Sequence, residues 1–303
     1  MAAGPAADAG ADRSGSEIDA AYYRLLTASA GFQAARELEE GILAEVLTLA
    51  GQPGEAAGLV PRVPGVIPEL LRSLEDEEVS PALLSQQVAQ DVVVMAEVIR
   101  EANSAYYRPM TPVKTVEAAL MMLGQNGLRM LLARIAFRPV IKMGADGFTR
   151  RAAPQIWGQS EKCALAASLL APGLSAGVFE SYLAGLMQNV GLVVAFRLAD
   201  RACADGKVPG SSEFGIRLLA GSRQLSAAIA RHWEFPHEVA DAIWQAGAQE
   251  NTSLGQALAI GDRIAKLRLL LDACVLSEDD ELVSSGLDSF QRRCLGKLAN
   301  MDG

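Results

Sequence analysis

Signals that start and stop helices recur along almost the whole chain, and they constrain the fold more than any other feature of the sequence. Ser80-Pro81 places a preferred N-cap residue before a proline at the first helical position. Ser16-Glu17-Ile18-Asp19 and Ser277-Glu278-Asp279-Asp280 resemble capping boxes, and Gly51-Gln52-Pro53-Gly54 is typical of a helix end. No alternation of strand-like and helix-like segments lies between these signals. The sequence therefore predicts an all-α protein.

The composition agrees with this fold class, because aromatic residues make up only 5% of the chain while alanine and leucine are plentiful. With 50% hydrophobic residues, a chain of 303 residues can bury a sizeable core. The predicted helices follow Ser16, Ser80 and Ser277 and cover residues 32–49, 92–102, 115–124, 128–143, 149–170, 178–200, 212–220, 223–233, 237–247 and 253–273.

Charge and targeting signals exclude several classes of protein. The net charge of −9 and the pI near 4.9 argue against nucleic acid as the main partner. No uninterrupted apolar run reaches the length of a membrane span, and the first twelve residues lack the features of a signal peptide. The four cysteines form no Cys-x-x-Cys pair, which favours small buried thiols in a reducing compartment. We therefore expect a cytoplasmic protein.

Two groups of motifs occur in the two halves of the chain. The first half contains Ile99-Arg100-Glu101-Ala102-Asn103-Ser104-Ala105-Tyr106, then residues 115–119, Leu123-Gly124 and Leu128-Arg129, preceded by a proline-containing approach over residues 61–71. The second half contains Trp157-Gly158-Gln159-Ser160, residues 183–191 and Trp233-Glu234-Phe235-Pro236. In this order and spacing the motifs resemble the HDOD domain, the HD-related output domain of bacterial signalling proteins.

The resemblance extends over about residues 61–272 and implies an HD-domain-like helical fold of two packed halves. A loop around Gly144-Ala145-Asp146-Gly147 is expected to separate these halves. The predicted organisation is a disordered tail (1–15), an N-terminal helical extension (16–60), an HDOD domain (61–272) with an N-terminal half (61–147) and an HD-like half (148–272), and a C-terminal helix (273–303).

The resemblance also implies where a metal site would lie and that it has degenerated. In HD phosphohydrolases the run equivalent to residues 183–191 carries adjacent His and Asp, which hold one or two divalent cations. Here these positions are Gln188 and Asn189. Amide oxygens bind transition metals far more weakly than imidazole or carboxylate, and without a cation nothing activates an attacking water. We expect a degenerate site of Ser160, Gln188 and Asn189, with no metal and no cofactor. These buried amides either tie neighbouring carbonyl groups together or form a polar pocket that binds a ligand without turning it over.

Two other patterns suggest catalysis but have simpler interpretations. The only histidines, His232 and His237, are too few for a zinc site, although His237 and Asp241 could share a helix face. Gly173-Leu174-Ser175-Ala176-Gly177 satisfies the Gly-x-Ser-x-Gly pattern of a hydrolase elbow, which must follow a buried strand. A helical run precedes it here, so a glycine-rich loop between helices is the better interpretation.

A basic stretch offers a candidate partner or ligand surface. The segment from 118 to 145 contains Arg129, Arg134, Arg138 and Lys142 but no acidic residue, and the last three repeat every four residues along one helix face. Such a face could dock an acidic partner or the phosphates of a small nucleotide. The simpler interpretation, which we favour, is a solvated face whose aliphatic stems cover the core. The acidic residues 75–78 are most simply a solvated loop between helices.

These observations predict a non-catalytic signal-transduction module that acts through protein contacts. The resemblance implies partners on separate chains, namely kinases, response regulators or cyclic-dinucleotide enzymes, and a homo-oligomer stays open. The first alternative is a sensor of a small ligand, such as a nucleotide or cyclic dinucleotide. The second alternative is a residual metal-dependent phosphohydrolase.

Overall fold

A computed structural model of the protein confirms the all-α class, and it describes residues 6–60, 80–89, 92–104, 107, 109–142, 147–246, 252–284 and 286–299. The longer helices of this part are α1 (Ala6–Thr27), α2 (Arg36–Ala50), α5 (Pro81–Ala89), α6 (Val92–Ala102), α7 (Val116–Lys142), α8 (Gly147–Leu170), α9 (Val178–Met187), α10 (Val190–Ala202), α11 (Ser212–His232), α12 (His237–Gln245), α13 (Ser253–Asp272) and α15 (Ser289–Leu298). The shorter elements are α3 (Pro53–Gly58), α14 (Glu281–Ser284), and the 3₁₀ turns η1 (Ala28–Ala30) and η2 (Ala171–Leu174). The strands β1 (Gly31–Phe32) and β2 (Val208–Pro209) form one short parallel pair.

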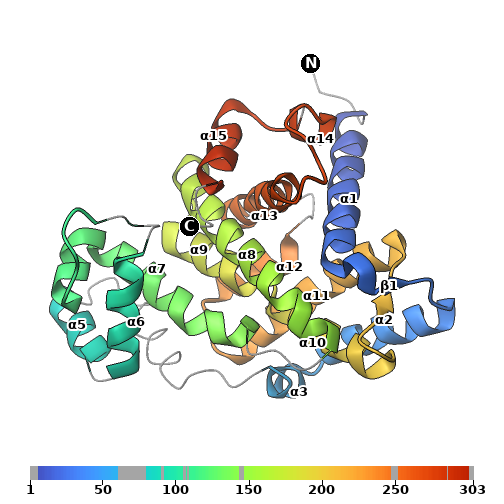
Figure 1. The fold of residues 1–303 in the computed structure, drawn as a ribbon, viewed down its shortest axis with the longest axis horizontal. Helices are drawn as coiled ribbons and strands as arrows, with labels where there is room; N and C mark the ends of the chain where they lie inside the picture. Colours follow the sequence, from blue (N-terminus) through green and yellow to red (C-terminus); the bar gives the residue numbers. More distant parts are fainter. Residues whose placement is uncertain are drawn as a thin grey trace.

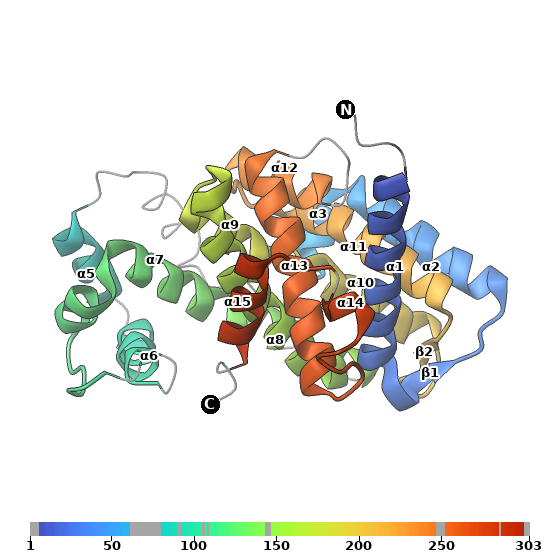
Figure 2. The same ribbon diagram turned by 90° about the horizontal axis from the view of Figure 1, so that it is seen from above.

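The molecule has a large helical body and a smaller group of helices at one end (Figures 1 and 2). In the body, α8 packs against α9 and α13, while α11 packs against α1, α2, α3, α10 and α12. The smaller group consists of α5, α6 and the beginning of α7 around its own apolar cluster, which includes Val98 and Leu128. The rest of α7 reaches the main core through Phe137 and Ile141, so this one helix joins the two parts.

Helix α7 bends where a break is predicted. The backbone of Gly124 has φ 69° and ψ 176°, a conformation that interrupts the helix and that side-chain-bearing residues rarely adopt. The predicted N-cap at Ser80 is confirmed, because Ser80 Oγ accepts from Leu83 N at 3.2 Å. Thr115, where a helix is predicted to begin, caps α7 in the same way, and its Oγ1 accepts from Ala118 N at 3.1 Å.

The predictions for the chain ends are partly wrong. Residues 6–15 belong to α1, so the prediction of a disordered tail is wrong for these residues. Ser16 lies inside the same helix rather than at its start. The final long helix does not begin after Ser277. Its capping box is formed by Asp288 and Gln291, because Asp288 Oδ1 accepts from the backbone N–H groups of both Phe290 and Gln291 at 2.8 Å.

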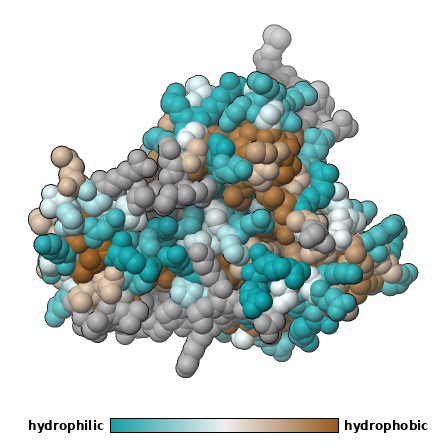
Figure 3. Space-filling model, viewed as in Figure 1, coloured by the Kyte–Doolittle hydropathy of each residue, from teal (hydrophilic) through white to brown (hydrophobic). Residues whose placement is uncertain are grey.

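The N-terminal helices are part of the body and do not form a separate layer. Tyr22 and Tyr23 of α1 and Val46 of α2 are fully buried in the main core. Tyr23 Oη also donates to Pro209 O of β2 at 2.6 Å, which ties α1 to the strand pair. A second apolar cluster joins α1, α8 and α13 to α15. Between α1 and α13, Figure 3 shows apolar side chains at the surface, over a groove lined by Ala21, Leu25, Val275, Leu276 and Leu282.

Two helix boundaries in the second half differ from prediction. Residues 212–232 form one helix where two are predicted. The predicted helix over 178–200 is two helices, α9 and α10, separated at Gln188 and Asn189. The segment Val178–Ala202 is apolar and long enough to cross a membrane by composition, but 94% of that apolar window is buried inside the protein. The approach over 61–71, the acidic residues 75–78 and most of the loop around Gly144 lie outside the described residues.

Candidate functional site

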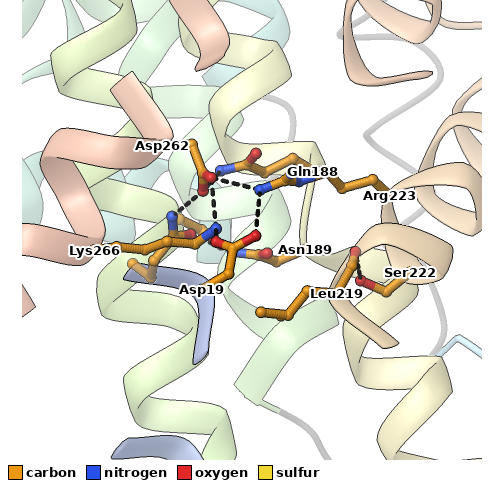
Figure 4. A network of polar contacts seen from close by, with 10 residues as sticks. Asp19, Gln188, Asn189, Leu219, Ser222, Arg223, Asp262 and Lys266 are labelled. Atoms are coloured by element: carbon orange, nitrogen blue, oxygen red, sulfur yellow. Dashed lines mark hydrogen bonds and ion pairs between the residues drawn. The ribbon is translucent and has the colours of Figure 1, made fainter. Parts of the chain in front are cut away.

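The break between α9 and α10 brings the three predicted site residues together. Gln188 and Asn189 end one helix and precede the next, and Figure 4 shows their side chains among those of the polar network. Asn189 Nδ2 donates to Ser160 Oγ at 3.0 Å and also to Gln159 Oε1. Ser160 is fully buried, and Gln188 and Asn189 are only 1% and 8% exposed. The three residues thus lie inside the protein, where no solvent-borne substrate reaches them without a rearrangement.

Asp262 of α13 is the centre of this site, and no sequence motif indicates it. Its Oδ1 accepts from Gln159 Nε2 at 2.6 Å and from Gln188 Nε2 at 3.1 Å. Its Oδ2 accepts from Arg223 Nη2 and from Lys266 Nζ, both at 2.6 Å. Four donors, one each from α8, α11, α13 and the junction between α9 and α10, therefore saturate one carboxylate.

Asp19 of α1 completes a partly buried cluster of two carboxylates and two cations, in which Lys266 and Asp262 are buried while Asp19 and Arg223 are each 19% exposed (Figure 4). Its Oδ1 accepts from Lys266 Nζ at 2.6 Å, and its Oδ2 lies 3.9 Å from Arg223 Nη2. Burial alone would raise the pKa of Asp262, but Lys266 and Arg223 outweigh burial and hold this pKa below its usual range. The cluster is therefore charged and balanced, with two positive and two negative side chains.

The metal site implied by the resemblance does not fit these residues. Ser160, Gln188 and Asn189 are uncharged, and both oxygens of Asp262 already accept from fixed donors. A divalent cation at Asp262 would lie beside the positive charges of Arg223 and Lys266, and would have to displace them. Gln188 Oε1 is buried without a hydrogen-bond partner, but a single neutral oxygen is no metal site. Across the described ranges, no group of three or more His, Cys, Asp or Glu side chains could hold a metal ion.

The structure pairs two arginines of the predicted basic face on α7 with glutamates of neighbouring helices. Arg134 Nη1 donates to Glu101 Oε2 of α6 at 2.6 Å, and its Nε donates to Glu161 of α8. Arg138 Nη1 donates to Glu101 Oε1 at 3.1 Å. Arg129 is buried, and the side chain of Lys142 lies outside the described residues. The arginines form a bridge between the smaller helical group and the body instead of a free cationic surface.

The arginine bridge supports a prediction about Glu101, whose side chain is only 10% exposed. We expect Glu101→Gln to lower the free energy of unfolding by about 2 kcal/mol, because it removes charged hydrogen bonds to Arg134 and Arg138. Urea denaturation followed by circular dichroism measures the loss, and amide hydrogen exchange in α6 should become faster. The matched control is Glu97→Gln on the same helix. Glu97 pairs with the exposed Arg100, so its loss should cost less than about 1 kcal/mol. Equal effects of the two substitutions would contradict a role of Glu101 in joining the parts.

The other predicted patterns lie apart from this cluster. His232 and His237 are exposed at the ends of α11 and α12, and Asp241 pairs with Arg231. Ser175 follows the turn η2 and a helix, so the loop interpretation of the Gly-x-Ser-x-Gly pattern is confirmed.

Comparisons with known proteins agree with the fold and the motifs. Residues 60–248 match the HDOD domain family. An uncharacterised protein of Treponema pallidum is 25% identical over an alignment of 194 residues, and the match covers 61% of this chain and 37% of that protein. The chain thus spans little more than a third of that curated relative.

Several solved structures share the fold at low identity. An HDOD domain protein from Geobacter sulfurreducens is 21% identical with a TM-score of 0.58, covering 84% of this chain and 94% of that one. A proposed phosphohydrolase from Shewanella amazonensis is 23% identical with a TM-score of 0.58, covering 82% and 93%. A proposed signal transduction protein from Marinobacter aquaeolei is 23% identical with a TM-score of 0.55, covering 79% and 60%. At this identity the structures establish the common fold and nothing about activity.

Proposed function

Since the chain belongs to the HDOD family, we propose that it is a non-catalytic module of signal transduction that acts through contacts with other proteins. In this proposal the HD-like half keeps the shape of a hydrolase domain, while the place of the metal site holds a self-contained cluster of side chains. The proposed partners are signalling proteins on separate chains, such as kinases, response regulators or cyclic-dinucleotide enzymes, and the proposed location is the cytoplasm.

One observation supports the loss of catalysis most directly. The carboxylate of Asp262 is neutralised inside the protein by Arg223 and Lys266, so it has no oxygen left for a metal or for a water molecule. Hydrolysis in such a site needs either a cation that lowers the pKa of water or a carboxylate that can take a proton from it. A buried carboxylate whose pKa is held below its usual range is a poor base at neutral pH.

The ion pairs of Arg134 argue against the alternative hypothesis that the basic face of α7 binds a nucleotide. The guanidinium of Arg134 already pairs with Glu101 and Glu161, so phosphates would have to compete with two carboxylates for it. We therefore do not place a ligand there.

The proposal predicts that the purified protein neither binds a divalent cation tightly nor hydrolyses phosphoesters. We expect less than about one tenth of an equivalent of metal by elemental analysis, because the amide side chains and the neutralised Asp262 are weak ligands. We also expect no turnover of bis-p-nitrophenyl phosphate or of cyclic dinucleotides with added Mn²⁺ or Mg²⁺. Metal-dependent turnover that disappears in both Asp262→Asn and Gln188→Ala would overturn the proposal. Turnover that survives both substitutions would identify a contaminating enzyme.

A further inference from the structure

A second polar site lies away from the Asp262 cluster, in a cavity of about 590 Å³ at the end of α10. It is bounded by the last turn of α10, by the loop that leads from α10 to β2, and by Leu59 after α3. Its volume is within the range of cavities that hold small organic ligands. Two arginines on α10, Arg197 and Arg201, contribute to its lining and are four residues apart, so they lie on the same helix face.

Arg197 carries an unbalanced positive charge in this cavity. Its Nη1 donates to the backbone oxygen of Leu59, but its Nε is buried with no acceptor. Among the described residues, neither Arg197 nor Arg201 forms an ion pair with a carboxylate. Burial lowers the pKa of Arg197, and no neighbouring carboxylate raises it. Arginines that are partly buried and unpaired are costly to a protein unless something else neutralises them.

The aspartates of the cavity do not supply that neutralisation. Asp200 is committed to the beginning of α8, where its oxygens accept from Phe148 N at 2.8 Å, from Thr149 N at 2.9 Å and from Thr149 Oγ1 at 2.5 Å. Asp205 is exposed in the following loop, at a positive φ of 59°. The negative charge of Asp200 therefore stabilises the helix N-terminus of α8, while the two guanidinium groups of α10 keep free donors.

We propose that this cavity binds the phosphate group of a small molecule, with Arg197 and Arg201 as its ligands. Guanidinium groups present several N–H donors in one plane and recognise phosphate oxygens better than single-point cations do. The two arginines one helix turn apart can hold one phosphate from two sides. The site is distinct from the Asp262 cluster, so the ligand would regulate the module and would not be turned over by it. The absence of such a ligand would leave the proposed signalling role unchanged.

The test uses the full chain and three probes: inorganic phosphate, pyrophosphate and adenosine monophosphate. Thermal-shift and calorimetric titrations are run against sodium chloride at matched ionic strength. We expect a saturable rise in Tm with at least one probe, and binding weakened about tenfold or more in Arg201→Gln and in Arg197→Lys. The lysine keeps the charge and a donor toward Leu59, so that variant should fold. Arg201 is exposed, so its replacement should not affect folding either.

Arg293→Gln is the matched control, because Arg293 is an exposed arginine on α15, where it lies over the ring of Phe290. Binding should be unchanged in this variant. No saturable shift with any of the three probes would overturn the proposal. A shift that persists in both α10 variants would place the anion elsewhere and would overturn it as well.

Discussion

Replacing Asp262 by alanine is expected to lower the free energy of unfolding by about 3–5 kcal/mol. The substitution leaves the buried Lys266 and the partly buried Arg223 with only Asp19 as counter-charge, and it removes the acceptor of the Gln159 and Gln188 amides. A buried charge without its partner is far more costly than the net value of the intact pair. Urea denaturation at pH 7 measures the loss.

The matched control is Asp241→Ala, which removes an aspartate whose ion pair with Arg231 lies at the surface, at 44% and 47% side-chain exposure. It should change stability by less than about 1 kcal/mol. If Asp262→Ala lowered the free energy of unfolding as little as Asp241→Ala does, water would have to solvate Arg223 and Lys266 in place of the lost carboxylate. In that case a metal ion could displace Arg223 and Lys266 from Asp262 at little cost.

The same carboxylate predicts a dependence on pH. In the unfolded chain an aspartate takes up a proton near pH 3.9, whereas in the folded protein the pKa of Asp262 is held lower by Lys266 and Arg223. The stabilisation is therefore complete above about pH 5 and is lost as the pH falls below 4 toward the folded pKa. Stability curves of the wild type and Asp262→Ala should thus run parallel at neutral pH and converge in acid.

The sequence predicted the class of fold well, because helix signals are local. Ser80, Thr115 and the break at Gly124 are confirmed, since each depends on a few neighbouring residues. The prediction that a helix begins at Ser16 is wrong because it also depends on a local signal alone. The alanine-rich residues before it favour helix strongly enough to extend α1 back to Ala6, past the local cap signal.

The candidate site was predicted only in its uncharged part. Ser160, Gln188 and Asn189 were found through their motif positions, and the structure brings them together. Asp19 and Lys266 are 247 positions apart, and no local pattern relates them. One signal was available: Asp262 and Lys266 are four residues apart within an apolar helix, but a charged pair on a helix is ordinarily expected to face solvent.

The ion pairs of the basic face on α7 could not be read from the sequence for a related reason. Residues 118–145 contain no acidic side chain. The carboxylates that pair with Arg134, those of Glu101 and Glu161, come from the helices before and after α7. Charge along one segment does not reveal the charge that packing brings to it from elsewhere.

The positions of the two site amides also depend on close packing between α10 and α11, at Gly191. The Gly191 N–H donates to Ser226 Oγ at 2.8 Å, and this hydroxyl donates in turn to Gln188 O at 2.6 Å. A Cβ on Gly191 would lie 2.2 Å from Ser222 O and 2.6 Å from Ser226 N, and both are backbone atoms of α11. An alanine can be accommodated only if the two helices move apart.

We therefore expect Gly191→Ala to lower the free energy of unfolding by about 3 kcal/mol, since overpacking against backbone cannot be relieved by a change of rotamer. Gly41→Ala on α2 is the control, because its Cβ would meet nothing within 4 Å and alanine favours helix. That variant should be neutral or stabilised by about 0.5–1 kcal/mol. Thermal and urea unfolding of both variants provide the measurement. If Gly191→Ala were as stable as Gly41→Ala, α10 and α11 would have to lie farther apart than described, and the backbone of Gln188 would not be held by Ser226.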